Sequence, residues 1–560
     1  MGAMNDEAQI GGSYAPPARR SVSLWGVSTL PLHPFLFAAA SVFRLYASNL
    51  HELYFSDVGP ALAVALAAAL VLFLAFGAVL KHLGAKAAIL ASAALVAGLF
   101  YSEIVDAANR YLGLGLSPVA ALPIILAVMA IIGVAVGRAR IDFTPASVVL
   151  NGVAFVLFIF PAWQLASHEW SAARGSLDTA KALDGGTREA TDMSIVADPT
   201  KVKDTPDIYY VIFDRYGSQA TLAEHFGFDN GDLVAFLEAQ GFYVASESHA
   251  NYLKTAHSLA STFHMGYLDF LGKDPRSKIN DWHPIFDMLR DHRVGRFLKS
   301  NGYDFIQIGS WWGPTQHNPF ADENYSFGFS EFEHRYLRKT IIPAVLNAVA
   351  PAGTYAKRLQ WEIGQCHRVP RQIEKVKEIS ERDEATFVFA HILVPHDPYV
   401  FGPDGRCLSF EEAKRRTKRD GYVEQVRYAN SLIKDFVSTL LSREGPKPII
   451  IIQADEGPFP DRYRYSNRSW RDATIDELKM KMSILNAYYF PDGDYRDLDQ
   501  HVTSVNTFRI LFNKYFGTRL ERLPDRVFAF PDYSHVYDFF DITDVVGGAR
   551  PEGRKAQEHR

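Results

Sequence analysis

The sequence is poor in cysteine, with only Cys366 and Cys407 among its 560 residues. Two thiols exclude a disulfide-rich scaffold and a metal site built from cysteines. They leave open one disulfide in an oxidising compartment or two free thiols. The chain also lacks a large excess of charge of either sign, since its formal net charge is −5. This balance gives no indication of nucleic-acid binding, and we expect no nucleic-acid partner.

Long apolar runs are abundant in residues 30–166, whereas the rest of the chain is polar and rich in aromatics. Five of these runs approach the roughly 20 residues that a helix needs to cross a bilayer. They cover 30–49, 60–79, 87–103, 118–136 and 145–166. Five runs in succession exceed what the core of a soluble domain requires, so the sequence predicts a bundle of about five transmembrane helices over 30–166. Arg44 interrupts the first run, which argues against a cleavable signal peptide.

The charges of the short loops predict the orientation of this bundle. Basic residues lie before the first run, between the second and third, and between the fourth and fifth: Arg19, Arg20, Lys81, Lys86, Arg138 and Arg140. The alternate loops are mainly acidic. By the positive-inside rule, residues 1–29 are expected in the cytoplasm and everything after the fifth run on the outer side.

The remaining chain divides into a polar linker at 167–205, an outer domain at 206–546 and a polar tail at 547–560 that we expect to be disordered. In the outer domain, strand-like and helix-like runs alternate. Strands are predicted at 207–213, 242–246, 303–308, 386–393, 448–454 and 485–490. Helices are predicted at 231–240, 256–268, 285–300, 373–381, 411–416 and 423–442. The alternation predicts an α/β domain with a mainly parallel sheet covered on both faces. Residues 329–372 fit this pattern less well and are read as a packed helix or as a surface element touching lipid headgroups.

Three predicted strands lead into a potential metal ligand or nucleophile. Asp214 follows the first strand, Thr255 lies beyond the second, and Asp455-Glu456-Gly457 closes the strand at 448–454. Loops at the carboxyl ends of parallel strands meet in one crevice. Carboxylates that converge on a hydroxyl favour a nucleophile activated by a metal ion.

Each of these residues also has a plainer interpretation. Asp214 and Thr255 could simply be capping or turn residues. A hydroxyl at a helix N-terminus is nevertheless in a field that favours its deprotonated form, and a divalent cation would favour it further. Two adjacent carboxylates at the end of a buried strand are costly unless a cation compensates them, which favours a metal role for Asp455 and Glu456.

Two histidines lie around a proline-containing loop after the strand at 386–393. His391 and His396 occur in His-Ile-Leu-Val-Pro-His-Asp-Pro-Tyr. The prolines restrict the backbone of this loop, which suits a residue that must be held in place. His396 could donate to a phosphate or sulfate oxygen or protonate a leaving group, whereas the alternative is a packing role for both rings.

Taken together, these motifs resemble the alkaline phosphatase superfamily, specifically its membrane-anchored sulfatase-like branch. That branch includes lipoteichoic acid synthases, phosphoethanolamine transferases and glucan phosphoglycerol transferases. Such proteins carry about five N-terminal membrane helices followed by an extracytoplasmic sulfatase-like domain. The resemblance therefore implies a multi-pass protein of the bacterial inner membrane whose catalytic domain is periplasmic.

The resemblance also implies roles for individual residues. Asp214 matches the family's metal-binding acid, Thr255 its threonine nucleophile and Asp455 the acid of its Asp-His-Gly motif. The Cys/Ser-x-Pro-x-Arg motif of sulfatases proper is not found. His396 resembles the histidine on the substrate side, and the residues expected to bind substrate are His391, Trp311, Trp312 and Lys254.

One position departs from the family pattern, because Glu456 replaces the histidine of Asp-His-Gly. If Glu456 still ligates, the set of Asp214, Thr255, Asp455 and Glu456 is all oxygen. Hard oxygen ligands suit one divalent ion, with Mn²⁺, Mg²⁺ or Ca²⁺ favoured over Zn²⁺. The alternatives are weakened metal binding and a member that has lost catalysis.

The expected function is a membrane-embedded, metal-dependent phosphotransferase. Its donor would be a membrane phospholipid, whose phosphoglycerol or phosphoethanolamine headgroup passes through a covalent threonine intermediate. The acceptor would be a glycan or polymer of the cell envelope. The alternatives are a hydrolase of the same fold, either a phosphodiesterase or a sulfatase, and a non-catalytic binding module.

Overall fold

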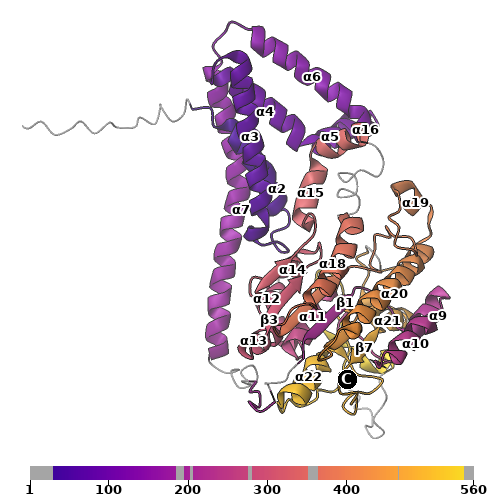
Figure 1. Ribbon diagram of the computed structural model, residues 1–560. Helices are drawn as coiled ribbons and strands as arrows, with labels where there is room; N and C mark the ends of the chain where they lie inside the picture. Colours follow the sequence, from indigo (N-terminus) through magenta and orange to yellow (C-terminus); the bar gives the residue numbers. More distant parts are fainter. Residues whose placement is uncertain are drawn as a thin grey trace, which may run out of the picture.

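The computed structural model describes residues 30–184, 195–201, 206–274, 281–350, 364–463 and 466–547. The predictions for 1–29 and for the tail beyond 547 lie outside these residues. In Figure 1 the N-terminal helices form a bundle above an α/β domain, and the long helix α7 (Thr144–Asp184) runs down beside both. This arrangement confirms the predicted fold class of apolar helices followed by an α/β domain.

The bundle contains α2 (His33–Ala47), α3 (Gly59–Leu80), α4 (Ala85–Leu99), α5 (Tyr101–Leu112), α6 (Pro118–Arg138) and α7. By length and composition, three segments of the described chain can cross a membrane: Phe55–Leu80, Pro118–Arg138 and Thr144–His168. The pair α4 and α5, bent by 73° at its junction, is a fourth if it counts as one span. The first predicted span, α2, has 15 residues and is about 22 Å long, which is less than the hydrocarbon core of a bilayer. The described residues therefore hold three or four candidate spans where the sequence predicted about five.

Polar side chains inside the bundle are paired with one another. The buried His33 ring contacts Ser92 Oγ at 2.5 Å through Nδ1 and Ser147 Oγ at 3.1 Å through Nε2. Asn151 Oδ1 accepts from the His33 N–H at 2.8 Å. Such pairing is required where no water is present to satisfy polar groups. Arg44, in contrast, is exposed.

Helix α7 is 41 residues long and continues past the last predicted span. Residues 167–184, the first half of the predicted linker, are consequently helical. Of the remainder, the structure describes 195–201, while 185–194 and 202–205 lie outside the described residues.

The α/β domain is built on a seven-stranded sheet of order β2-β7-β6-β1-β5-β3-β4. The strands are β1 (Ile208–Phe213), β2 (Tyr243–Val244), β3 (Asp304–Ile308), β4 (Glu323–Tyr325), β5 (Thr386–Ile392), β6 (Ile449–Gln453) and β7 (Asn486–Tyr489). β1 is parallel to both β5 and β6, whereas β7 is antiparallel to β6 and β2. All six predicted strands are present, and β4 was missed because its three residues carry no apolar pattern.

Helices cover both faces of this sheet, as predicted. They include α9 (Gln219–Phe226), α10 (Gly231–Ala239), α11 (Thr255–His264), α12 (His283–Arg290), α13 (Arg293–Ser300), α14 (Gly313–Gln316), α18 (Gln365–Ile379), α19 (Phe410–Arg415), α20 (Lys418–Ser442), α21 (Ile475–Met482) and α22 (Thr507–Phe516). Alternate residues of a strand point to opposite faces. On β1, Tyr210 packs on Phe263 of α11, while Phe213 stacks on Phe436 of α20. The predicted helix at 285–300 is two helices, because the backbone becomes extended at Asp291 after α12. His292 then caps α13 by accepting from the Gly295 N–H.

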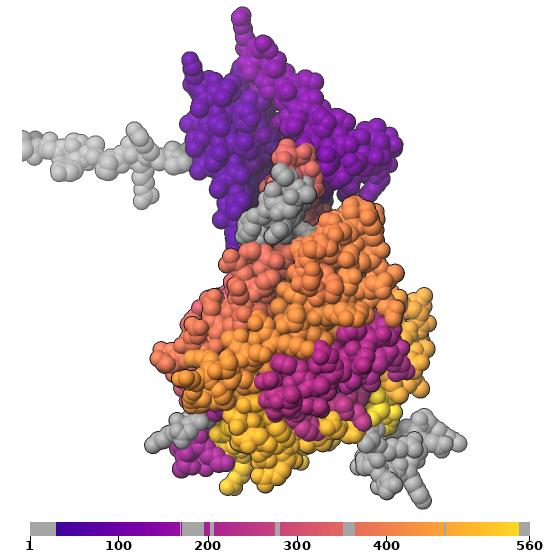
Figure 2. Space-filling model, turned by 45° about the vertical axis from the view of Figure 1, so that its right-hand side comes forward, coloured from indigo at the N-terminus to yellow at the C-terminus, as the bar shows by residue number. Residues whose placement is uncertain are grey.

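Two short helices join the bundle to the α/β domain. They are α15 (Glu331–Lys339) and α16 (Ile342–Val349). In Figure 1, α15 lies between the two parts and α16 lies beside α5, and Figure 2 shows this salmon-coloured region at the base of the bundle. Tyr336 of α15 contacts Ser41 of α2 through their hydroxyls at 2.7 Å, and the Ile341 N–H donates to the Gly98 carbonyl at 2.7 Å. Phe332 and Tyr336 share an apolar core with residues of α2 and α3. Within the ambiguous segment 329–372, α15 is a packed helix, whereas α16 buries Ala344 and exposes Ile342 and Val349. Residues 351–363 lie outside the described residues.

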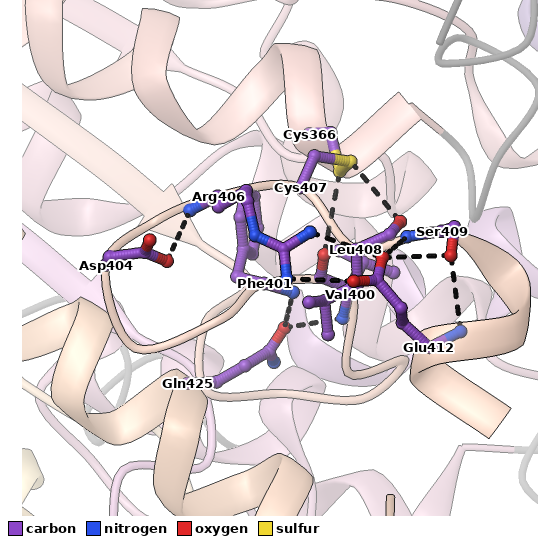
Figure 3. Close-up of a disulfide and its surroundings, with 10 residues drawn as sticks. All are labelled: Cys366, Val400, Phe401, Asp404, Arg406, Cys407, Leu408, Ser409, Glu412 and Gln425. Carbon is purple, nitrogen blue, oxygen red and sulfur yellow. Dashed lines mark hydrogen bonds and ion pairs between the residues drawn. A yellow bond between two sulfur atoms is a disulfide. The ribbon is translucent and has the colours of Figure 1, made fainter. Parts of the chain in front are cut away.

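The two cysteines form a disulfide, shown in Figure 3. Cys366 lies in the first turn of α18, and Cys407 lies in the loop between β5 and α19, with their Cα atoms 5.6 Å apart. The bridge ties α18 to the loop region that also carries His396. It resolves the alternative that the sequence left open.

Candidate active site

The ends of three neighbouring strands bring Asp214, His391 and Asp455 together. β1 lies between β5 and β6, so the residues at its carboxyl end have partners on both sides. One ligand atom from each of the three buried residues lies within 4.8 Å of the other two. His391 Nε2 is 3.2 Å from Asp214 Oδ2. We call these three residues the acidic centre.

His391 occupies a different place from the one predicted for it. It was expected to bind substrate, yet its side chain is fully buried between Thr315 and Asp214. Thr315 Oγ1 contacts Nδ1 at 2.8 Å, which leaves Nε2 facing Asp214. Partners of this kind orient the rings of metal-binding histidines. The structure thus places His391 among the potential ligands.

Thr255 is the first residue of α11 and lies beside Asp455. Burial and the neighbouring charges of Asp214 and Glu456 raise the pKa of Asp455 well above its usual value, although a side-chain hydrogen bond from Thr255 opposes this. Two carboxyl groups thus share a dry site next to a hydroxyl. A cation between them would relieve their repulsion.

Asp214 has the character of an ionised ligand. Burial opposes its ionisation, but His396, His391 and Arg215 together lower its pKa to about 2. Its Oδ1 atom has no hydrogen-bond partner among the described residues. An open, charged oxygen in a buried site fits a divalent cation, as does the donor set of two carboxylates and one imidazole. Because this set contains nitrogen, the argument for Mn²⁺, Mg²⁺ or Ca²⁺ over Zn²⁺ does not apply to it.

Glu456, the fourth predicted ligand, lies outside the acidic centre and faces two cations. Its Oε1 atom is 2.9 Å from Lys481 Nζ and 3.0 Å from Arg215 Nε. The Glu456 and Lys481 side chains are both buried. Burial acts to raise the pKa of Glu456, but Lys481 and Arg215 outweigh it and lower that pKa. Arg215 also pairs with Asp397, so the guanidinium joins two acids.

Three cationic side chains surround the ring of Phe459. Lys481 Nζ, Lys254 Nζ and Arg215 Cζ lie 3.6, 4.2 and 4.5 Å from its centroid. An aromatic face attracts cations and holds them near one another. Lys254 directly precedes Thr255, and burial lowers its pKa to about 8. Lys254, which the sequence predicted to contact the substrate, therefore places a positive charge next to the candidate nucleophile Thr255.

The other predicted substrate residues lie around the acidic centre. The His396 ring meets the Trp311 ring at 6.1 Å, and the Trp312 ring meets His391 at 6.2 Å. Burial and the charge of Arg215 lower the pKa of His396, while Asp214 opposes this. A cleft of ≈ 320 Å³ lies at Arg215 and is lined mainly by aromatic and basic side chains such as Tyr399, Arg419 and Phe459, with Asp397 and Asp461 among the others.

Sequence reasoning missed Arg215 and Lys481. Arg215 follows Asp214 directly but carries no motif of its own, and it adopts a left-handed backbone with φ of 63°. Lys481 lies near the end of α21, where a lysine ordinarily faces solvent. The sequence contains no signal for its burial.

No family model and no curated protein matches this sequence. Several solved structures are similar to it. The periplasmic domain of EptC from Escherichia coli, in a complex with Zn, is 10% identical and covers 62% of this chain and 97% of its own, with a TM-score of 0.41. A protein of the alkaline phosphatase superfamily from Vibrio parahaemolyticus is 12% identical over 61% of this chain and 79% of its own, with a TM-score of 0.36. The putative sulfatase yidJ from Bacteroides fragilis is 14% identical over 56% of this chain and 74% of its own, with a TM-score of 0.36.

Proposed function

We propose that this chain is a membrane-anchored, metal-dependent enzyme of the sulfatase-like kind that transfers a phospholipid headgroup through Thr255. The observation that carries the proposal is the position of the Thr255 hydroxyl, at the start of α11 and beside Asp455 of the acidic centre. Thr255 is partly accessible, whereas the residues of the acidic centre are buried. This arrangement fits a nucleophile presented to a substrate from a fixed site.

Asp214, His391 and Asp455 would hold one divalent metal ion. When bound, such an ion favours the alkoxide of a nearby hydroxyl and neutralises charge on a phosphoryl group. Glu456 is not needed as a ligand in this arrangement, because Lys481 and Arg215 already compensate its charge. The replacement of the expected histidine therefore does not remove the centre.

In the first half of the reaction, the Thr255 hydroxyl releases its proton to solvent and its oxygen attacks the phosphorus of the lipid phosphodiester. The bond from phosphorus to the diacylglycerol oxygen breaks, and that oxygen takes a proton from His396. The headgroup phosphate stays on Thr255 as a new phosphodiester. Lys254, beside Thr255, attracts the non-bridging oxygens throughout.

In the second half, a hydroxyl of an envelope glycan or polymer attacks the same phosphorus. The acceptor hydroxyl gives its proton to His396, which restores that residue. The bond to Thr255 breaks, and the Thr255 oxygen takes a proton from solvent as the product leaves. The apolar helices keep the enzyme next to a donor that resides in the bilayer. The disulfide supports an extracytoplasmic, periplasmic location for the α/β domain, because disulfides persist in oxidising compartments.

The test is the mass of the intact protein after incubation with phosphatidylglycerol or phosphatidylethanolamine in micelles. We expect an added headgroup phosphate located on Thr255, no adduct in Thr255→Ala and a retained adduct in Thr255→Ser. Full headgroup transfer by Thr255→Ala would rule out this mechanism. Release of free headgroup phosphate regardless of acceptor would identify a hydrolase instead.

A further inference from the structure

A second group of potential metal ligands lies where the helical bundle meets the α/β domain. It consists of His51 from the segment after α2, His168 of α7 and Asp281 just before α12, and one ligand atom from each lies within 4.8 Å of the others. The His51 and His168 rings are 5.2 Å apart. Tetrahedral zinc holds neighbouring ligand atoms about 3.3 Å apart, so small side-chain adjustments bring these atoms into one coordination sphere.

Asp281 is held in position by a further histidine. His283 contacts Asp281 Oδ1 at 2.6 Å through Nδ1 and at 3.0 Å through its backbone N–H. His283 Nε2 contacts the Leu53 carbonyl at 3.0 Å, so both ring nitrogens of His283 are engaged. The second oxygen, Oδ2, lies 3.9 Å from His168 Nε2. His283 thus holds Oδ1 of Asp281, while Oδ2 faces His168. Residues that orient a metal ligand in this way are common around metal sites.

The backbone fixes His51 to the same place. The Trp282 N–H donates to the His51 carbonyl at 2.9 Å. The side chain of Asp281 is 1% exposed and that of His168 is 12% exposed. A buried carboxylate surrounded by imidazoles therefore lies at a point where three remote segments of the chain meet.

We propose that His51, His168 and Asp281 bind a divalent ion of the zinc class and that this ion clamps the helical bundle to the α/β domain. Two imidazole nitrogens and one carboxylate oxygen form a donor set that zinc accepts, with water in the fourth position. Two ligands come from the bundle and one from the α/β domain, so the ion bridges the two parts. This site is separate from the acidic centre and does not depend on the proposed transfer reaction.

The clamp lies at one end of a row of aromatic contacts that leads to the acidic centre. Trp282 packs on His257 of α11 at 5.6 Å and on Phe286 at 5.7 Å. Phe286 meets Trp312 at 5.7 Å, and Trp312 meets His391. The ion would thereby support the helix that begins at Thr255 as well as the contact between the two parts.

The test uses the full chain in detergent micelles, with Asp214→Asn and Asp455→Asn introduced to remove the acidic centre as a metal site. After equilibration with zinc and removal of unbound ion, we expect one zinc ion per chain by elemental mass spectrometry. Adding His51→Ala and His168→Ala should abolish this zinc, whereas His317→Ala, at an exposed histidine elsewhere, should retain it. No zinc in the parent, or zinc undiminished by the two substitutions, would overturn the proposal.

Thermal unfolding separates loss of the site from loss of the fold. Zinc should raise the melting temperature of the parent but not that of the His51→Ala/His168→Ala form, whose zinc-free melting temperature should match the parent. A second variant, His283→Gln, keeps all three ligands but releases Asp281, and we expect its zinc Kd to rise by about 10–100-fold. If the double variant does not fold, an unchanged Kd in His283→Gln overturns the site.

Discussion

Glu456 shows how a single residue changes the charge pattern around the acidic centre. Its carboxylate is compensated by Lys481 and Arg215, and all three groups are nearly or fully removed from water. A pair of this kind contributes little net stability, but each partner depends on the other. Glu456, which the sequence predicted as a metal ligand, thus uses its Oε1 atom to pair with two cations.

Removing one partner should therefore be more damaging than removing both. We expect Glu456→Gln to lower the free energy of unfolding by about 3–5 kcal/mol, since it leaves the Lys481 charge buried without its main counter-ion. The combined change Glu456→Gln/Lys481→Met should recover most of that loss. Denaturant unfolding in micelles, followed by circular dichroism, measures both. Equal stability of the single variant and the wild type would contradict the ion-pair interpretation.

Lys254 should give the transfer reaction a dependence on pH at the alkaline side. Burial lowers the pKa of Lys254 to about 8, so its positive charge is present below that pH and is lost as the pH rises through it. KM for the anionic phospholipid should consequently rise above pH 8. Lys254→Arg keeps a charge at all these pH values and should abolish the rise. A pH profile of KM that is identical in both proteins would show that Lys254 does not bind the substrate.

The residues of the acidic centre were predictable to different degrees. Asp214 and Asp455 follow buried apolar strands, and parallel strands bring such positions together. Thr255 lies beyond the half-buried β2, at the start of α11. The role of His391 was not predictable from the sequence. The orientation of its ring depends on contacts with Thr315 and Asp214, which are remote in the chain. The burial of Lys481 follows from how α21 packs, which its local sequence does not encode.

At the scale of the elements, the disulfide fixes α18 to the loop between β5 and α19. Figure 3 shows the bridge next to Val400 and Phe401, where the Cys366 sulfur also lies 3.8 Å from the Val400 carbonyl. His396 lies in the same loop, a few residues before Val400. The bridge thereby restrains the segment that presents the proposed proton donor.

Loss of this bridge should destabilise the α/β domain. It closes a segment with a sequence separation of 41 residues, and constraining the unfolded chain over such a length stabilises a protein by about 3–4 kcal/mol. We expect Cys366→Ser/Cys407→Ser to lower the melting temperature, and the wild type treated with a reductant to show the same decrease. Identical melting curves for oxidised and reduced wild type would contradict this expectation.

Strand positions were predicted well because each central strand is a short run of apolar residues. β1, β5 and β6 are buried along their whole length, and this burial is what their composition indicates. Helix ends were predicted less well. The break between α12 and α13 depends on a cap by His292. The continuation of α7 to Asp184 was missed because its polar composition was interpreted as a linker.

At the scale of the whole molecule, the charges of the loops and the disulfide point to the same orientation. We expect Asp461→Cys, at a side chain that is 78% exposed in the α/β domain, to react in intact cells with a maleimide that cannot cross the inner membrane. Arg140→Cys, in the exposed loop between α6 and α7, should react only after the cells are opened. The reverse pattern would place the α/β domain in the cytoplasm.

The contacts of α15 and α16 with the bundle have a consequence for the acceptor in the proposed reaction. Phe332 and Tyr336 of α15 share a core with α2 and α3, whereas Ala344 of α16 packs with residues of α5 and α6. Both helices thus attach the α/β domain to the bundle. With the apolar helices in a bilayer, Thr255 would be held at a fixed height above the membrane surface. In the proposed reaction, a glycan that diffuses freely would reach this height, whereas a polymer anchored at another height would not meet the nucleophile.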